Sequence, residues 1–184
     1  MNALDALHLR SSVPKLSDPL PDQEVLNNIY KAAFRAADHA VLRPWRFLII
    51  KGNSRQRLGQ LFVEAARADN PDLSDERIAK LQAKPMRAPM IIVSISSIKE
   101  HPKVPAFEQD LSAAAATQNM LQAAFVQNIG AMWRTGSMAY HSVVKNGLGL
   151  TAQEKIIGFV YIGTISGGTK QLNEPEVGHF FKDW

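Results

Sequence analysis

The chain has 184 residues, 46% of them hydrophobic and 21% charged, which is the composition of a folded domain and not of a disordered or fibrous protein. It carries 21 Lys and Arg against 17 Asp and Glu, a formal charge of +4, and no basic run exceeds two residues, so a nucleic-acid-binding module is not indicated. The absence of cysteine excludes a disulfide scaffold, a cysteine-ligated metal and a thiolate nucleophile. No apolar run reaches the roughly 18 residues of a membrane span, and no secretory leader is recognisable, so we expect a cytoplasmic protein without membrane contact.

Apolar periodicity and capping residues predict alternating helices and strands in the first part of the chain. Residues 2–9 place apolar side chains on one helical face, and Asp22 is a suitable N-cap for a helix that extends to Ala36. Residues 38–44 break the helical period, and the apolar residues 45–51 after them predict a buried strand.

Two shorter helices and a second strand are expected before the longest helix. Residues 53–69 keep helical spacing, and Ser74 is positioned to cap the helix that follows. The β-branched and apolar run over residues 90–96 predicts a buried strand. The long helix is expected over residues 108–128, with Gly130 as the glycine that ends it.

The last third of the chain predicts short elements and a polar tail. We expect a strand over 131–134, a helix over 142–146, a β-rich strand over 156–162 and a Gly-rich tail from residue 166. Four strands separated by helices, with no internal repeat or linker, predict one domain over residues 1–184. Its class is α/β or α+β with a central sheet.

Common catalytic and nucleotide-binding motifs are missing from the sequence. There is no P-loop, and Gly147-Leu-Gly149 lacks the third glycine of a dinucleotide-binding turn. Gly136-Ser137 is not the nucleophile elbow of a hydrolase, and the five histidines do not have metal-ligand spacing, so we expect no metal site.

Three stretches combine arginine with hydroxyl or aromatic residues beside a turn: residues 10–15, 35–47 and 130–136. Such stretches can hold a phosphate ester, because the guanidinium group is a planar fork of donors and Ser and Thr add neutral donors. Each residue also has an ordinary structural interpretation: Arg10 could satisfy the carbonyls that end a helix, Trp133 could lie in the core, and His39 could make a local hydrogen bond.

The order and spacing of these stretches resemble the nitroreductase family of flavin enzymes. The family's Arg-x-Ser loop after a first helix is matched by Arg10-Ser11-Ser12, its Pro-Trp ahead of the first strand by residues 44–45, and its Trp-Arg-Ser/Thr-Gly turn by residues 133–136. The resemblance extends from residue 3 to residue 163. It implies an α+β fold, a three-layer α-β-α sandwich with a central mixed sheet.

The resemblance also implies FMN as cofactor, bound in sites formed where two subunits of a homodimer meet. Arg10 and Arg134 would hold the phosphate, and Ser11, Ser12 and Thr135 would add hydrogen bonds to the cofactor. Trp133 would lie beside the isoalloxazine ring. Arg35 and His39 match positions that contact the flavin. A further segment would approach the nicotinamide cofactor: Gln122, Ala123, Ala124, Phe125, Val126 and Gln127.

The activity implied is a ping-pong reduction, with NAD(P)H as donor and a nitroaromatic, quinone or related electron-poor small molecule as acceptor. The cofactor supplies the chemistry, so no side chain is named as a catalytic residue. One departure from the family leaves the partner of flavin N1 undecided. Pro14 stands where many members have lysine, so this partner could be Lys15, Arg35 or His39. Two alternatives are a flavin carrier or sensor with little turnover, and a nucleic-acid-binding domain, which the positive net charge alone suggests.

Overall fold

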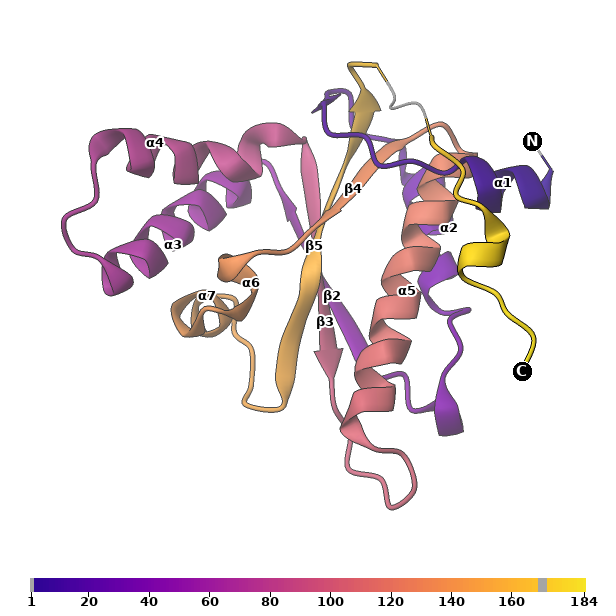
Figure 1. Ribbon diagram of the computed structural model, residues 1–184. Helices are drawn as coiled ribbons and strands as arrows, with labels where there is room; N and C mark the ends of the chain where they lie inside the picture. The colour runs from indigo at the N-terminus through magenta and orange to yellow at the C-terminus, as the bar shows by residue number, and fades with distance from the viewer. Residues whose placement is uncertain (1, 169–171) are drawn as a thin grey trace.

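A five-stranded sheet lies between two layers of helices in a computed structural model that describes residues 2–168 and 172–184 (Figure 1). The strands are β1 (Leu16–Ser17), β2 (Trp45–Lys51), β3 (Met90–Ser97), β4 (Gly130–Arg134) and β5 (Glu154–Ile165). Their order is β1-β5-β3-β2, and β4 also pairs with β5. Strand β3 is buried from Met90 to Ser96, as expected for a continuous apolar run between two layers.

The described strand pairings are antiparallel, although the resemblance implied a mixed sheet. Between β3 and β5 the chain crosses the length of the sheet twice, once in helix α5 (Ala106–Val126) and once along β4 (Figure 1). It therefore enters β5 at the end where β3 finishes, with Ser97 opposite Glu154, and the two neighbours run in opposite directions.

Helices cover both faces of the sheet, which confirms the three-layer α+β architecture. One face carries α2 (Gln23–Ala33) and α5, with α1 (Ala3–Leu9) beside α5. The other face carries α3 (Ser54–Asp69), α4 (Asp75–Ala83), α6 (Ser137–Tyr140) and α7 (Ser142–Gly147). Three short 3₁₀ helices complete the description: η1 (His39–Val41), η2 (Lys84–Arg87) and η3 (Val177–His179).

The expected N-caps are confirmed in atomic detail. Asp22 Oδ1 accepts a hydrogen bond from the Val25 N–H at 2.9 Å, and Ser74 Oγ accepts one from the Arg77 N–H at 3.3 Å. Each cap satisfies one of the amide groups that a helix leaves unpaired at its start. Residues 38–44 break the helical pattern and β2 begins at Trp45, both as expected.

Some predicted boundaries are wrong. Helix α5 ends at Val126, and Asn128, with φ of 58°, takes the left-handed conformation that was expected of a glycine. Gly130 instead begins β4, where a Cβ atom would collide with Leu16. Strand β1 and helix α6 were not expected, because two and four residues are too few for periodicity to show.

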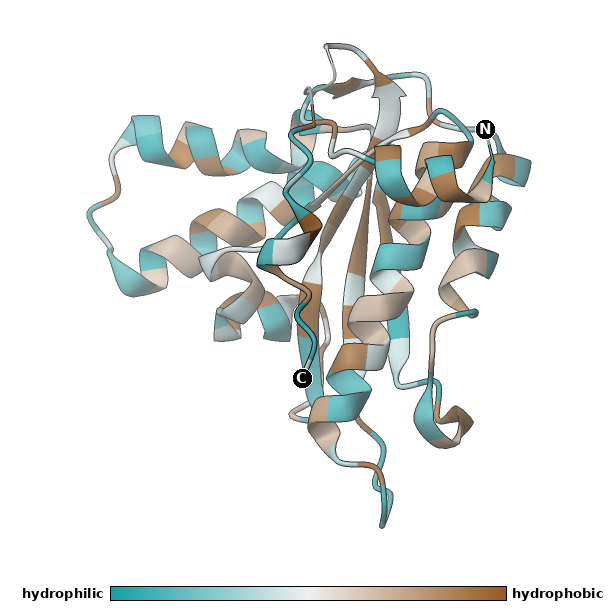
Figure 2. Ribbon diagram, turned by 45° about the vertical axis from the view of Figure 1, so that its right-hand side comes forward, coloured by the Kyte–Doolittle hydropathy of each residue, from teal (hydrophilic) through white to brown (hydrophobic). Residues whose placement is uncertain are grey.

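Two separate hydrophobic cores lie on the two faces of the sheet, and the apolar side of the helices turns inward in both (Figure 2). Phe62 of α3 meets Phe159 of β5 edge to face, with ring centroids 5.6 Å apart. On the opposite face, Ala113, Ala116 and Ala124 of α5 are fully buried. These small side chains permit close approach of the layers.

The end of the chain is not part of either core. The tail from Leu172 to Trp184 is exposed, including the aromatic side chains of Phe180 and Phe181. Among the described residues, no helix combines the length and the apolar character that crossing a lipid bilayer requires.

Candidate functional site

The loop that contains Arg10, Ser11 and Ser12 leaves α1 and runs beside the start of β4. The Val13 N–H donates to the Ala131 carbonyl at 3.0 Å, which fixes the loop against this strand. Arg10 and Ser11 line a small cavity of about 50 Å³ together with Leu121 and Phe125 of α5. This loop therefore belongs to the α5 side of the sheet.

Strand β4 sends alternate side chains to opposite faces of the sheet. Ala131 and Trp133 belong to the core beneath α2 and α5, whereas Arg134 points to the face of α3 and packs on Tyr161. The Trp133 indole N–H donates to the Ile157 carbonyl at 3.1 Å and lies against Gly158. Trp133 thus has the core role that the sequence left open, and its edge also lines the cavity next to Arg134.

A cavity of about 440 Å³ lies beside Arg134 and is lined by three basic residues and no acidic one. We call it the cationic cavity. Its lining residues are Phe62, Lys84, Arg87, Met132, Trp133, Arg134, Thr135, Gly136, Met138, Phe159 and Tyr161. Gly136 has φ of 101°, a conformation that L side chains rarely adopt, and this sharp turn leaves Thr135 exposed at the mouth.

The electrostatics of the cationic cavity favour an anion. The guanidinium carbon of Arg134 is 5.4 Å from the centre of the Tyr161 ring, and Arg134 Nε is buried without a hydrogen-bond partner among the described residues. Burial, together with repulsion from Arg77 and Arg87, lowers the pKa of Lys84. Burial also raises the pKa of Tyr161, so its hydroxyl stays neutral. An unpaired donor among like charges is the arrangement that an anionic ligand would stabilise.

Arg10 and Arg134 do not line a common cavity within one chain. Arg10 lies on the α5 side and Arg134 on the α3 side of the sheet, at the two ends of β4. They can still contact two parts of one elongated ligand along this strand. Ala131 and Thr135 are four residues apart, about 13 Å in an extended chain.

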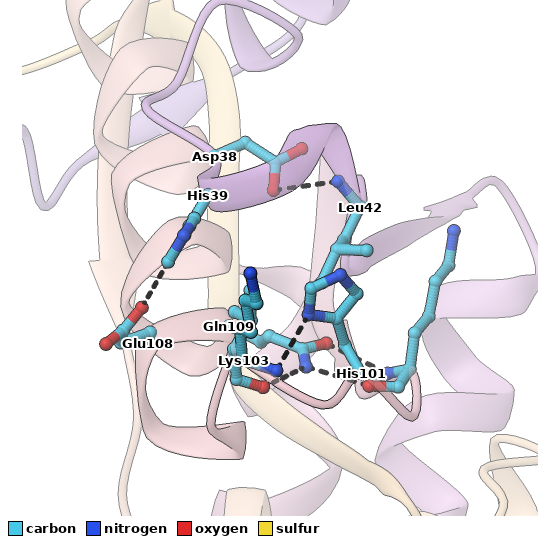
Figure 3. Close-up of polar contacts among 9 residues, drawn as sticks. Asp38, His39, Leu42, His101, Lys103, Glu108 and Gln109 are labelled. Carbon is cyan, nitrogen blue, oxygen red and sulfur yellow. Dashed lines mark hydrogen bonds and ion pairs between the residues drawn. The ribbon is translucent and has the colours of Figure 1, made fainter.

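Arg35 follows the end of α2, where Ala32 lies against Asn119 of α5, whereas His39 lies further along the chain, near the start of α5. His39 Nδ1 is 2.8 Å from Glu108 Oε2, the contact drawn in Figure 3. Arg35 is exposed to solvent. Because α5 is 21 residues long, Glu108 and Phe125 are about 25 Å apart along it. One chain therefore holds His39 and Arg10 at opposite ends of the same helix, too far apart to contact one small cofactor.

The segment Gln122 to Gln127 is only partly available to a ligand. Ala124 is fully buried, and the Gln127 amide donates to the carbonyls of Ala123 and Val25. Phe125 lines the small cavity beside Arg10, and Val126 is exposed. Gln122 Oε1 is buried and has no partner in the part of the chain that the structure describes.

Sequence reasoning missed Lys84 and Arg87 as site residues. Both lie in η2, just ahead of β3, in the run Lys-Pro-Met-Arg. Two cations around a proline before a buried strand were the available signal. The sequence alone did not indicate that η2 lies across the sheet from α2 and beside the end of β4.

Residues 9–164 match the model of a family described as the Nitroreductase family. The chain belongs to this family. Among curated relatives, the Escherichia coli K12 protein named "Putative NAD(P)H nitroreductase YdjA" is 40% identical over 164 residues, which cover 89% of this chain and 88% of that protein. A Haemophilus influenzae protein described in the same terms is 36% identical and covers 89% of each chain. The family assignment made from the three short stretches is confirmed.

Solved structures of nitroreductase family proteins share the fold. A nitroreductase-like protein from Bacillus cereus has a TM-score of 0.84 at 21% identity, with 100% of this chain and 96% of that chain covered. A nitroreductase from Desulfovibrio desulfuricans, described as a complex with FMN, has a TM-score of 0.76 at 21% identity and covers 100% and 98%. These similarities support the three-layer sandwich for the whole chain.

Proposed function

We propose that this nitroreductase family protein is an FMN-dependent oxidoreductase that takes electrons from NAD(P)H and reduces electron-poor acceptors such as nitroaromatics or quinones in a ping-pong cycle. The observation that carries the proposal is the cationic cavity, where the buried Arg134 Nε has no hydrogen-bond partner among the residues that the structure describes. The curated relatives are named as NAD(P)H nitroreductases, and the Desulfovibrio desulfuricans structure is described with FMN. Nitroreductase family membership and a cavity lined by cations therefore lead to the same ligand.

The donors along β4 suit a flavin mononucleotide. FMN carries an anionic phosphate at one end and a ring that gains negative charge on reduction at the other. We assign the phosphate to Arg10, Ser11 and Ser12, and the ring to Thr135 and the cationic cavity. Arg134 then serves the ring edge and not the phosphate, because its guanidinium group faces Tyr161 and the α3 layer.

When bound, FMN would accept a hydride from the nicotinamide and pass the electron pair to the acceptor. The chain's own contribution is electrostatic: Lys84, Arg87 and Arg134 stabilise the negative charge of the reduced ring without having to reorganise. Lys84 thereby joins Lys15, Arg35 and His39 as a partner for the N1 edge of the flavin. It is the one of these four that lines the same cavity as Arg134.

A second copy of the chain completes the site in this proposal. Arg35 and His39 would reach the flavin of the partner subunit, since the length of α5 separates His39 from Arg10 in their own chain. Apolar side chains are exposed on the helices that would meet the partner: Leu4 and Leu7 on α1, and Phe107, Leu111 and Val126 on α5. Patches of this kind mark protein interfaces.

The test is titration of the purified protein with FMN, followed by anaerobic mixing with NADH and NADPH. We expect tight FMN uptake, rapid bleaching of the flavin and sedimentation as a dimer. Arg10→Ala and Lys84→Ala should each weaken FMN binding about 10-fold or more, because a hydrogen bond to a charged group contributes about 1.5–3 kcal/mol. Lys80→Ala is the matched control, since Lys80 is exposed and pairs with Glu76 on α4.

Each result has a distinct meaning. Protein that takes up no FMN contradicts the proposal as a whole. FMN uptake without bleaching by either nicotinamide favours the alternative of a flavin carrier or sensor. A flavin-loaded monomer at low micromolar concentration contradicts the shared site.

A further inference from the structure

The loop around His39 has an unusual backbone that one carboxylate holds in place. Ala40, Val41 and Arg43 have φ of 63°, 53° and 48°, in the left-handed region that a β-branched residue such as Val41 rarely enters. Asp38 stabilises this shape: Oδ1 accepts from the Leu42 N–H at 3.2 Å (Figure 3), and Oδ2 accepts from the Arg43 N–H at 2.6 Å. Backbone strain of this kind persists where the surrounding contacts impose it, and it concentrates at ligand clamps and active sites.

The contact with Glu108 determines which nitrogen of His39 is free. An ionised carboxylate only accepts hydrogen bonds, so His39 Nδ1, at 2.8 Å from Glu108 Oε2, carries the proton. Nε2 then remains for a ligand, and no described hydrogen bond involves it. In the neutral ring Nε2 is an acceptor, and in the protonated ring it is a donor.

Neighbouring charged groups do not replace this pairing. Besides Glu108 on α5 and Asp38, the segments around the imidazole carry Arg35 and Arg43, and the loop before α5 carries His101 and Lys103 (Figure 3). Asp38 is occupied by backbone amides, and His101 Nδ1 accepts from the Lys103 N–H at 3.2 Å. Glu108 is the acidic group whose side chain contacts the ring.

The pair lies on an exposed part of the surface, beside exposed apolar side chains. The side chains of His39 and Glu108 are 57% and 45% exposed, and the flanking Val41 and Phe107 are 71% and 70% exposed. Covering these apolar neighbours would remove water from the pair. Glu108 would then be the acceptor that stays within reach of the covered ring.

We propose that Glu108 and Asp38 are positioning residues that present His39 Nε2 as a proton-bearing donor to a hydrogen-bond-accepting edge of the flavin ring held by the partner subunit. This inference rests on the proposed function and extends it to two acidic residues, since neither Glu108 nor Asp38 would touch the flavin. Its consequence is that flavin binding takes up a proton at His39. Affinity then falls as the pH rises and His39 loses that proton.

The experiment measures the Kd of FMN by fluorescence quenching between pH 5 and 9 for the wild type, Glu108→Gln and His39→Gln. It is repeated with riboflavin, because the FMN phosphate itself titrates near pH 6. In the wild type we expect riboflavin affinity to fall through one pH midpoint, and we expect the same loss to be superimposed on the phosphate titration in the FMN data. Glu108→Gln keeps a hydrogen-bond acceptor but removes the charge, so the midpoint should move to lower pH. His39→Gln should abolish the midpoint.

A second readout separates positioning from a merely structural role. The ring signals of His39, followed by NMR in the apoprotein and the FMN complex, should titrate at a higher pH when FMN is bound, and Glu108→Gln should reduce the difference. Glu176→Gln is the matched control, because Glu176 pairs with His179 in the exposed tail. We expect it to leave the midpoint unchanged.

The outcomes distinguish this inference from the proposed function. A wild type that binds no flavin contradicts the proposed function. A wild type that binds FMN with a midpoint unaffected by Glu108→Gln or His39→Gln overturns the inference alone. A uniform loss of affinity in Glu108→Gln at every pH, with the midpoint in place, would assign Glu108 a structural role and overturn it as well.

Discussion

Two strand arginines, Arg46 and Arg134, have opposite polar surroundings. Arg46 of β2 donates to both carboxylate oxygens of Glu154, from Nε at 2.5 Å and from Nη2 at 2.8 Å, and also to the Gly149 carbonyl at 3.2 Å. The Thr151 N–H adds a fourth bond, to Glu154 Oε2 at 2.9 Å. Arg134 of β4 instead lies among Lys84 and Arg87 with its Nε unpaired in the described chain.

Two arginines on strands of one sheet therefore have different roles, because the charged groups around them differ. The hydrogen bond from Arg46 lowers the pKa of Glu154 to about 2, so the Arg46–Glu154 pair is satisfied internally and contributes to stability. The cationic cavity has three cations and no acidic residue in its lining, so an anionic ligand would stabilise it. Substitutions at the two places should therefore affect different measurements.

The largest expected effect is at Glu154, whose side chain is only 6% exposed. Glu154→Gln leaves the Arg46 charge without its partner and should lower the free energy of unfolding by about 3 kcal/mol. Urea denaturation of the apoprotein measures this. Glu76→Gln, which breaks the exposed Glu76–Lys80 pair, is the control and should cost about 0.5 kcal/mol or less. Equal losses of unfolding free energy in the two variants would show that the Arg46–Glu154 pair contributes no more than the exposed Glu76–Lys80 pair.

At Arg134 the effect should appear in ligand binding and not in stability. Arg134→Met keeps the apolar stem over Tyr161 and removes the charge, so FMN affinity should fall roughly 10- to 100-fold. Apoprotein stability should stay equal or rise, because repulsion with Lys84 and Arg87 is relieved. Titration with FMN and thermal unfolding of the same samples measure both quantities. A destabilised variant with unchanged FMN affinity would show that Arg134, like Arg46, contributes to stability and not to ligand binding.

Acid should affect the Arg46–Glu154 pair in a defined pH range. The folded pKa of Glu154 is depressed to about 2 from an ordinary value of 4.5, so its contribution is complete above pH 4.5 and is lost as the pH falls towards 2. Between pH 6 and pH 3 the loss should be about 2 kcal/mol. Urea midpoints of the wild type and Glu154→Gln measure it. The difference between the two proteins should narrow at pH 3, and a constant difference would contradict the assigned pKa.

The smallest expected effect concerns the core position of Trp133. A Cβ atom at residue 158 would collide with the Trp133 indole, so Gly158→Ala should cost about 1–2 kcal/mol and shift the tryptophan fluorescence. Gly168→Ala is the control, because no atom of the described residues, apart from its chain neighbours, lies within 4 Å of a Cβ added there. If Gly158→Ala is as stable as the wild type, the Trp133 indole can move out of the core. That result would favour the place beside the flavin ring that the family resemblance implies for Trp133.

Local chemistry explains which elements the sequence predicted well. Asp22 and Ser74 cap α2 and α4 because a short side-chain oxygen can reach an amide three residues ahead, an interaction contained in the local sequence. The continuous apolar run of β3 likewise predicted a buried strand. The same reasoning missed β1, whose two residues are held as a strand only by Thr164 and Ile165, almost 150 residues later. It also placed the end of α5 at Gly130, although Asn128 adopts the required left-handed conformation.

The sequence by itself determined the nitroreductase family, the α+β layers and most helix starts, because periodicity, caps and three short motifs act over a few residues. Only the tertiary structure decided which donors share a cavity. The alternation of β4 sends Arg134 away from Arg10, and the packing of η2 brings Lys84 and Arg87 to Arg134. The length of α5 separates His39 from Arg10. Each of these relations depends on the path of the backbone between residues far apart in the chain, which spacing along the sequence does not encode.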